Sequence, residues 1–232
     1  MDRKLQRLTT RITACRRCPR LVAWRENVAR EKVRRFADQD YWGRPVAGFG
    51  DPRARLLLVG LAPAAHGANR TGRMFTGDRS GDWLYRALHK AGFANQPTAT
   101  SRSDGLELSD CYITAAARCA PPGNKPAREE FENCHGFLVE EMRLLTRIRV
   151  VLGLGKIGFD HAYGALCETR GLTPREKPPF SHGAEFQLDE NLWLLGAFHP
   201  SQQNTFTGRL TEPMFDAVFQ KARRTLTACS ES

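Results

Sequence analysis

A buried strand followed by a long, interrupted loop constrains the fold of this chain more than any other feature. Residues 56–59 are continuously apolar (LLLV), which is typical of a strand covered on both faces of a parallel sheet. Glycine and proline then break every helix or strand pattern until a helix begins near residues 81–84. Long loops in compact domains are usually functional, and ligands of open α/β sheets bind at the carboxyl ends of strands. Loop 60–82 is therefore the first place to expect a site.

Strand-like and helix-like segments alternate along the rest of the chain. Further strands are predicted at residues 111–114, 149–154 and 193–198, and helices at 20–36, 83–92, 126–143, 156–167 and 212–226, after an N-terminal helix that carries Leu5, Leu8 and Ile12. This alternation implies right-handed crossovers. It predicts an α/β fold in which helices sandwich a mostly parallel sheet of about four strands. We expect residues 1–232 to form one domain with flexible ends.

Three clusters of glycine, proline and polar residues are predicted to leave the carboxyl ends of strands. They lie at residues 60–82, 115–125 and 199–209. Because these strand ends meet at one edge of a parallel sheet, we expect the clusters to converge there. Residues 174–183 are rich in proline and are predicted to form a separate loop.

The charge of the chain favours a polyanionic partner. Lys and Arg number 35 against 25 Asp and Glu, which gives a net charge of +10. Arginine dominates the excess and suits phosphate, although an arginine-rich proteome produces the same bias. No apolar run approaches the roughly 18 residues of a bilayer-spanning helix, and the N-terminus has no signal-peptide core. We therefore expect a cytoplasmic protein without membrane association.

Four of the seven cysteines form a pattern that suits metal or cluster ligation. Cys15 and Cys18 form a CxxC pair at a helix break, and Cys119 and Cys134 flank a proline-rich turn. This spacing fits a four-thiolate cluster better than a compact zinc module. For Cys134 the alternative is a free thiol on the apolar face of a helix. Cys111, Cys167 and Cys229 are interpreted as ordinary cysteines.

His199 is the histidine in the most favourable position for chemistry. It lies between a predicted strand end and Pro200, so its backbone is extended and its imidazole is expected to project into the loop cluster. The polar residues that follow are expected to be flexible and to meet a groove. His66 and His135 lack such a context and are interpreted as structural.

Five segments, taken together and in order, resemble the motif set of the uracil-DNA glycosylase superfamily. They are GLAPA at 60–64, RMFTG at 73–77, YIT at 112–114, RCAPPGNK at 118–125 and HPS at 199–201. The chain is most similar to the iron-sulfur branch, and within it to family 5 rather than family 4. The resemblance covers roughly residues 10–225.

The resemblance implies roles for individual residues. The first motif, with Gly60, Leu61, Ala62 and Pro63, would cradle a flipped base through backbone groups, Phe75 would stack on it, and His199 would donate to its carbonyl oxygen. Cys15, Cys18, Cys119 and Cys134 match the positions that hold a four-iron, four-sulfur (4Fe–4S) cluster. Two departures stand out. Leu61 and Ala62 occupy positions where relatives often have an acid or amide, and Ala115 stands where family 4 has a base-reading Asn.

The implied activity is that of a monofunctional glycosylase, which hydrolyses the N-glycosidic bond of a flipped base and leaves an abasic site. Asp78 is our preferred candidate for orienting the attacking water. Asp82 is the second candidate and could instead cap the helix near Trp83. Asn124 could read the Watson–Crick edge of the base or act only as a turn residue. Without a strict base-reading Asn, the pocket is expected to accept deaminated purines such as hypoxanthine as well as uracil.

The residues after His199 are expected to contact DNA, both double-stranded and single-stranded. Gln202, Gln203 and Phe206 could wedge the duplex, with Ser201 beside them, and Arg209 could hold a phosphate. We expect the protein to act as a monomer.

Two other functions remain open at this point. One is a non-catalytic protein that binds damaged or single-stranded DNA, which Leu61 and Ala62 favour and which His199 and Phe75 disfavour. The other is an iron-sulfur or zinc redox protein, in which the cysteines would serve electron transfer and the loop motifs would have no role.

Overall fold

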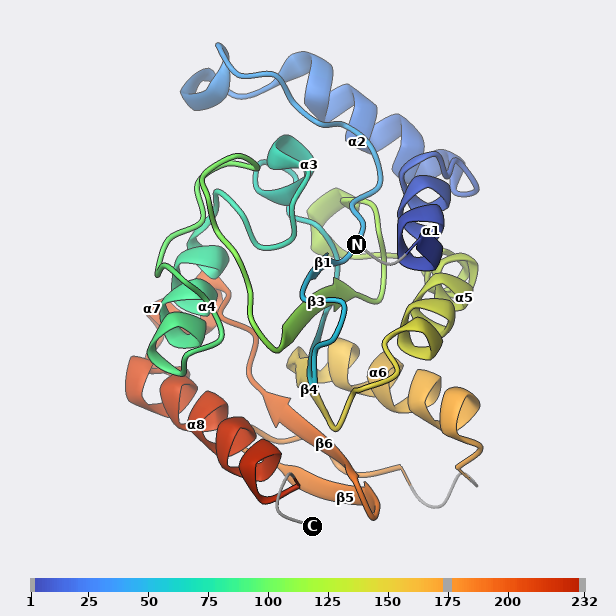
Figure 1. The fold of residues 1–232 in the computed structure, drawn as a ribbon. Helices are drawn as coiled ribbons and strands as arrows, with labels where there is room; N and C mark the ends of the chain where they lie inside the picture. The colour runs from blue at the N-terminus through green and yellow to red at the C-terminus, as the bar shows by residue number, and fades with distance from the viewer. Residues whose placement is uncertain (1–2, 173–176, 230–232) are drawn as a thin grey trace.

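The computed structural model describes residues 3–172 and 177–229, and its centre is a six-stranded sheet (Figure 1). The strands are β1 (Phe49–Gly50), β2 (Leu56–Gly60), β3 (Cys111–Ala115), β4 (Val150–Leu154), β5 (Glu185–Asp189) and β6 (Leu192–Ala197), in the spatial order β1-β3-β2-β4-β6-β5. The four inner strands are parallel, and both edge strands are antiparallel to their neighbours. The predicted α/β class is confirmed, but the expected number of about four strands is wrong.

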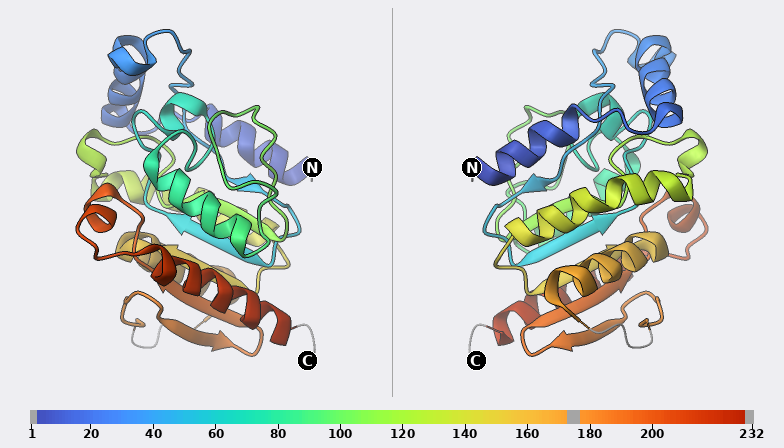
Figure 2. Two further views of the ribbon diagram at one scale, coloured as in Figure 1. Left: turned by 90° about the vertical axis from the view of Figure 1, so that its left-hand side faces the viewer. Right: turned by 90° about the vertical axis from the view of Figure 1, so that its right-hand side faces the viewer.

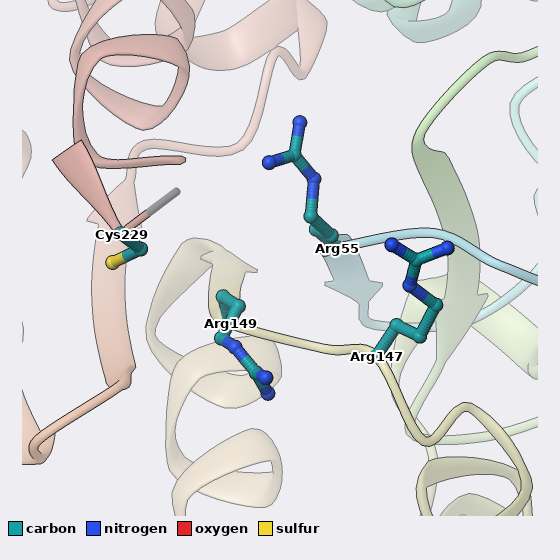
Figure 3. Close-up of a pocket in the computed structure, with 4 residues that line it drawn as sticks. All are labelled: Arg55, Arg147, Arg149 and Cys229. Atoms are coloured by element: carbon teal, nitrogen blue, oxygen red, sulfur yellow. The ribbon is translucent and has the colours of Figure 1, made fainter. Parts of the chain in front are cut away.

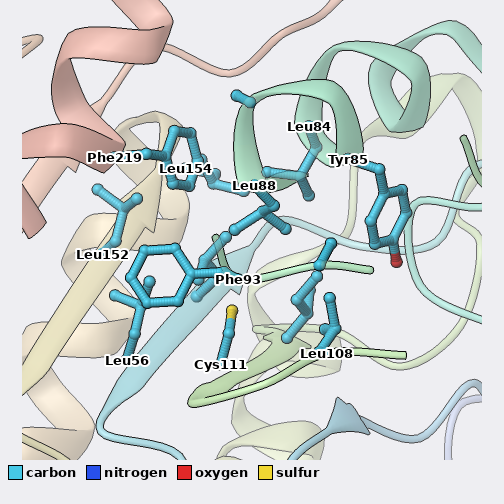
Figure 4. Packing of buried hydrophobic residues seen from close by; sticks show 14 of the residues in the cluster. Leu56, Leu84, Tyr85, Leu88, Phe93, Leu108, Cys111, Leu152, Leu154 and Phe219 are labelled. Carbon is cyan, nitrogen blue, oxygen red and sulfur yellow. The ribbon is translucent and has the colours of Figure 1, made fainter. Parts of the chain in front are cut away.

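The parallel strands are buried on both faces, as the apolar run at residues 56–59 predicts. Leu56 and Leu58 belong to one hydrophobic layer, and Leu57 and Val59 belong to the other. Figure 4 shows part of the first layer, in which Phe93 belongs to the same cluster as Leu56. A continuous apolar run is required because alternate side chains of a strand point to opposite faces.

The two strands that the sequence did not predict lie at the edges of the sheet. β5 has the sequence EFQLD, and its residues are partly exposed, so it lacks the signature of a buried strand. β1 contains only two residues within a glycine-containing loop. Edge strands are often short or polar because one side of each lies open to solvent.

Helices cover both faces of the sheet (Figure 2). One face carries α4 (Arg79–Lys90) and α8 (Glu212–Ala228), and the other carries α1 (Arg3–Thr13), α5 (Arg128–Leu144) and α6 (Gly155–Arg170). Leu5, Leu8 and Ile12 form the buried stripe of α1 and share a hydrophobic cluster with α5. The remaining elements are α2 (Pro19–Glu31), η1 (Arg34–Phe36), α3 (Ala68–Thr71), η2 (Pro122–Asn124) and α7 (Gln202–Phe206).

Three predicted boundaries are wrong. The helix expected at 20–36 ends at Glu31, because Lys32 adopts φ 54° and breaks the helical path before the short η1 turn. Helix α4 begins at Arg79 rather than near Trp83, because Asp78 caps it. The segment after His199, expected to be flexible, contains helix α7, which Ser201 caps.

The order of the parallel strands creates a switch point between β2 and β4. From β2 the chain crosses to β3 on one side, and β4 then lies on the other side of β2. Crevices at the carboxyl ends of such strands are the usual binding sites of open α/β sheets.

Some expectations concern residues that lie outside the described ranges. These are the flexible ends, at 1–2 and 230–232, and residues 174–176 of the loop predicted at 174–183. Within the described ranges, no helix combines the length and the hydropathy that a bilayer-spanning segment needs.

Candidate active site

A cavity of about 1300 Å³ opens at the switch point, between the loops that leave β2, β4 and β6. The residues that border it include Leu61 and Ala62 from the first loop, Leu154 at the end of β4, Gly155 at the start of α6, and His199 after β6. Asp78, Asp82, Asn124, Ser201, Gln202 and Gln203 border it as well. The predicted convergence of three loop clusters at one edge of the sheet is therefore confirmed.

The glycine that opens the first motif is required by the position of Phe75. A Cβ on Gly60 would lie 2.9 Å from the Phe75 ring. The backbone of Phe75 has φ 52°, and its ring centroid lies 5.8 Å from that of His199 at an interplanar angle of 34°. His199 borders the cavity. Gly60 and Phe75 are not among the described residues that line it. Stacking of Phe75 on a base stays a prediction.

Several backbone carbonyls of the first motif are occupied within the protein. The carbonyls of Gly60 and Leu61 accept hydrogen bonds from the amides of Ala116 and Ala117, both at 2.9 Å. Pro63 is buried, whereas Leu61 and Ala62 are partly exposed to the cavity. Leu61, Ala62 and Ala64 are thus the residues of this motif that border the cavity.

His199 has the surroundings of a neutral hydrogen-bond donor. Burial lowers its pKa to about 4, so the ring is uncharged near pH 7. No described residue forms a hydrogen bond with its ring nitrogens, while its main-chain carbonyl accepts from Asn204 Nδ2 at 2.8 Å. The imidazole therefore borders the cavity with its N–H available to a ligand.

Asp78 and Asp82 both border the cavity but differ in their surroundings. Asp78 caps α4, since its Oδ1 accepts from the amide of Gly81 at 3.0 Å, and any side chain at Gly67 would collide with its carboxylate. The capping role considered for Asp82 therefore belongs to Asp78. Burial raises the pKa of Asp78, whereas Asp82 is exposed on the first turn of α4.

Asn124 stands at the rim of the cavity and also acts as a turn residue. It is exposed, it ends η2, and its backbone has φ 57°. Its main-chain N–H donates to Pro121 O at 3.3 Å. Asparagine tolerates this left-handed conformation better than most residues. The turn interpretation thus holds, and a base-reading role for its side chain stays a prediction.

The residues expected to contact DNA surround the mouth of the cavity unevenly. Gln202 and Gln203 are exposed and border it, whereas Ser201 is half-buried and accepts from the Asn204 amide at 3.4 Å. Phe206 is 66% exposed, with the Arg79 guanidinium 4.3 Å from its ring centroid. Arg209 is exposed and lies over Phe198 at 4.6 Å, outside the cavity lining within the described chain.

The sequence interpretation missed one wall of the cavity. Arg35, Phe36 and Gln39 line it together with Arg70 of the first loop, and no role in a site was predicted for these first three residues. A possible signal was Phe36, an aromatic residue at the end of a basic run.

Four thiols border a second, smaller cavity near the N-terminal helices. Cys15, Cys18, Cys119 and Cys134 line it together. Arg17 Nε lies 3.5 Å from Cys15 Sγ, Asn133 Nδ2 3.5 Å from Cys18 Sγ, and Arg25 Nη1 3.6 Å from Cys119 Sγ. Cys111 is fully buried in the sheet, and Cys167 and Cys229 border neither this cavity nor the larger one.

The chemistry around these thiols fits a group that carries negative charge. Arg25 is 1% exposed, and its Nε has no partner in the described chain. The carboxylate nearest to Arg25, that of Glu26 at 3.7 Å, is solvent-exposed and bound by Arg16. A buried cation with so little compensation is costly, and thiolates on Cys119 and its neighbours would supply the missing charge. Burial raises the pKa of Cys119 to about 12, so ligation would have to release its proton.

The spacing of the donors does not suit a single metal ion. Across the described ranges, no three His, Cys, Asp or Glu side chains close around one point that a metal ion could occupy. A 4Fe–4S cluster binds each thiolate to a different iron, so its ligands surround a larger volume.

A third cavity, of 270 Å³, lies at the amino end of the central strands. Arg55, Arg147, Arg149 and Cys229 line it. Figure 3 shows the guanidinium groups of Arg55 and Arg147 pointing upward and that of Arg149 pointing downward, and Arg55 is bound to Asp110 at 2.6 Å. These arginines do not converge on one anion.

Comparison with known proteins gives a consistent assignment. The model of the family described as "Uracil DNA glycosylase superfamily" matches residues 47–223. A "Type-5 uracil-DNA glycosylase" of Mycobacterium leprae (strain TN) is 54% identical over 94% of this chain and 93% of its own length. Proteins of the same name from Thermus thermophilus and Pyrobaculum aerophilum are 51% and 44% identical, over 92% and 91% of this chain and 94% and 89% of their own lengths.

Proposed function

Because the chain belongs to the uracil-DNA glycosylase superfamily, we propose that it is a DNA repair enzyme that removes uracil from DNA. It hydrolyses the N-glycosidic bond of the flipped nucleotide and leaves an abasic site. The observation that carries this proposal is His199, neutral and free to donate, at the switch-point cavity beside Phe75. Type-5 relatives that align with more than nine-tenths of the chain support the same activity.

His199 acts on the leaving base. When the N-glycosidic bond breaks, the sugar gains cationic character and the base leaves as an anion. An N–H aimed at the carbonyl oxygen of uracil interacts more strongly with that anion than with the neutral base, so it lowers the barrier. A neutral imidazole suits this role because it already lies in a partly desolvated site and pays no cost of charging.

Asp78 orients the water that attacks the sugar. Its carboxylate is fixed by the α4 cap and half-buried at the cavity wall, whereas Asp82 is exposed. The raised pKa of Asp78 also makes its carboxylate a better acceptor for a proton of that water. Water activation by this residue replaces the acid or amide that relatives often place at Leu61 or Ala62.

The base is recognised with few fixed polar contacts. Leu61 and Ala62 offer an apolar surface in the cavity, Phe75 is proposed to stack on the base, and Asn124 reads its edge from the rim. The position of the base-reading Asn of family 4 is held here by Ala115, which is buried. We therefore propose that hypoxanthine is also accepted.

We propose that Cys15, Cys18, Cys119 and Cys134 hold a 4Fe–4S cluster. The shared cavity, the N–H groups directed at three of the four sulfurs and the buried Arg25 support this ligand set. When bound, the cluster supplies a cross-link between the N-terminal segment, the β3 exit and α5. These residues lie outside the cavity of His199, so the role is structural rather than catalytic.

The partner is DNA in both double-stranded and single-stranded form, and the protein acts as a cytoplasmic monomer. The net charge of +10 favours the phosphate backbone. Gln202 and Gln203, which are exposed and border the cavity, and Phe206, which is exposed beside Arg79, fill the gap that a flipped base leaves in a duplex. Their exposure suits contact with DNA.

The two other functions considered from the sequence have less support. A non-catalytic binder would have no use for a neutral, unpartnered His199 in the cavity, and a redox protein would have no use for the cavity itself.

One assay separates these functions. The protein is incubated with duplexes that contain one U·G, U·A or hypoxanthine pair, and alkali then converts abasic sites into strand breaks. Strand breaks at uracil are expected, and breaks at hypoxanthine test the broader specificity. Tight binding without breaks would instead support the non-catalytic binder.

A further inference from the structure

The cavity is larger than one flipped base requires. Its volume of about 1300 Å³ exceeds the roughly 300–1000 Å³ of typical small-molecule sites. His199 and Asp78 belong to one part, while Arg35, Phe36 and Gln39 belong to η1 and the turn after it. The proposed mechanism uses none of these last three residues.

Arg35 and Arg70 both contact the Phe36 ring at this wall. The Arg70 guanidinium carbon lies 3.9 Å from the centroid of the Phe36 ring, and that of Arg35 lies 4.9 Å from it. Arg70 is 7% exposed and rigidly held: Nε donates to His66 O and Nη2 to Gly77 O, both at 2.8 Å, and Nη1 donates to Gln39. Arg35 is exposed and Phe36 is partly exposed, so a ligand can reach both.

The two arginines of this wall have no direct carboxylate partner in the described chain, although Asp78 interacts with Arg70 at longer range. Within the described chain, neither Arg35 nor Arg70 forms an ion pair with a carboxylate, although many other arginines do. A flat cationic and aromatic surface of this kind matches a nucleotide, because bases stack on guanidinium planes and aromatic rings while phosphates pair with arginine.

We propose that Arg35, Phe36 and Gln39 form a subsite for the nucleotide next to the flipped one on the damaged strand. The inference rests on the proposed glycosylase function, since a strand that delivers a base to His199 must continue across the same cavity. The neighbouring base stacks on the Arg35–Phe36 surface, its phosphate pairs with Arg35, and the Gln39 amide is within the same wall. The subsite strengthens binding of the strand and leaves the bond-breaking step to His199 and Asp78.

The test uses single-stranded oligonucleotides with one uracil. In two of them, the nucleotide on the 5′ or the 3′ side of uracil is replaced by a baseless tetrahydrofuran spacer. Arg35→Ala and Phe36→Ala are compared with Arg34→Ala, a matched control in the same short turn that is exposed but does not border the cavity. Dissociation constants come from fluorescence anisotropy, and KM and kcat from uracil release.

Loss of one stacked base is expected to weaken binding roughly 5- to 100-fold. Arg35→Ala and Phe36→Ala should each raise the dissociation constant and KM for the intact strand, with Arg34→Ala close to the wild type. A spacer on one side of uracil should weaken binding by the wild type by a similar factor. The same spacer should weaken binding by the two variants much less. The side on which this happens identifies the stacked neighbour as 5′ or 3′. The subsite would be overturned if Arg34→Ala and Arg35→Ala lost affinity equally. It would also be overturned if the spacer weakened binding by Arg35→Ala and Phe36→Ala as much as it weakens binding by the wild type.

The proposed function and the subsite fail in different ways. If no uracil is released from any strand, the glycosylase proposal fails, and the anisotropy data still report whether spacer and variant effects are coupled. If uracil is released but that coupling is absent, only the subsite fails.

Discussion

His199 combines two properties that a sequence motif alone does not reveal. It is placed by the end of β6 at the cavity, and burial keeps it uncharged by lowering its pKa to about 4. A charged imidazole would be a stronger donor, but it would also bind the phosphates of undamaged DNA. The neutral ring reserves its contribution for the charge that develops on the leaving base.

The first prediction concerns the loss of that donor. His199→Ala should lower the single-turnover rate of uracil release by about 10²- to 10³-fold, the scale for removing one preorganised donor, with little change in DNA affinity. Asp78→Asn should cost less, because Asn still caps α4 and still accepts a hydrogen bond from water. Asp82→Asn is the matched control. A larger defect in Asp82→Asn at equal stability would reverse the assignment of the two acids.

The second prediction is the pH dependence of the rate. Burial raises the pKa of Asp78, and its carboxylate acts in the ionised form, so uracil release should fall as the pH drops through that raised pKa. His199 loses its proton at about pH 4, so it adds no change near neutral pH. In single-turnover rate profiles, Asp78→Asn should remove the acidic decline. A decline that persists in this variant would assign it to another group.

The third prediction concerns Arg25, whose guanidinium lies 3.6 Å from Cys119 Sγ and 3.4 Å from Cys15 O. If it compensates cluster charge, Arg25→Met should yield protein with less bound iron and weaker absorbance near 400 nm after anaerobic purification. Arg16→Met is the control, because Arg16 is exposed and pairs with Glu26. This variant should keep its iron. Colourless wild-type protein with stoichiometric zinc would contradict the cluster itself.

At the scale of elements, the end of α2 stores strain. Lys32 has φ 54° and ψ −172°, a conformation that is close to glycine-only. The fourth prediction is that Lys32→Gly raises the free energy of unfolding by about 1 kcal/mol, even though it removes the exposed bond from Lys32 Nζ to Ala37 O. Glu31→Gly, at the last residue of α2, should instead lower it by about 0.5 kcal/mol. Denaturant midpoints measure both, and an unchanged Lys32→Gly midpoint would refute the strain.

The sequence predicted the elements whose side chains follow one clear burial pattern. β2 and β4 are buried on both faces, and continuous apolar runs predict them. The helical spacing of Leu5, Leu8 and Ile12 predicts α1. The edge strand β5 was missed because its pairing depends on β6, not on its own composition. The end of α2 was missed because a lysine, rather than glycine or proline, breaks the helix there.

The same distinction applies to the site. Motifs beside strand ends, such as Leu61, Ala62 and His199, were predicted because topology alone brings them together. The wall formed by Arg35 and Phe36 depends on how α2 packs beside α3, a long-range contact that no local pattern encodes. Sequence reasoning therefore found the part of the cavity built by the sheet and missed the part built by the N-terminal segment.

At the scale of the whole molecule, the fifth prediction separates the two ends of the sheet. DNA affinity should fall steeply with salt. A plot of the logarithm of the association constant against log[salt] should have a slope of about −0.9 for each phosphate contact. Arg79→Ala, at the cavity beside Phe206, should reduce that slope by about 1. Arg147→Ala, at the opposite edge, should not change it. Equal effects of the two variants in titrations at several salt concentrations would argue against one DNA-binding edge.

The N-terminal helices depend on partners that are synthesised much later. The stripe of α1, with Leu5, Leu8 and Ile12, packs with α5, and Cys15 and Cys18 share their cavity with Cys134 of that helix. A chain leaves the ribosome N-terminus first, so α1 and α2 emerge well before the surface that covers them. The proposed cluster could therefore form only after α5 has been synthesised. Until then, a nascent chain presents the uncovered apolar stripe of α1 to chaperones and proteases for longest at its oldest end.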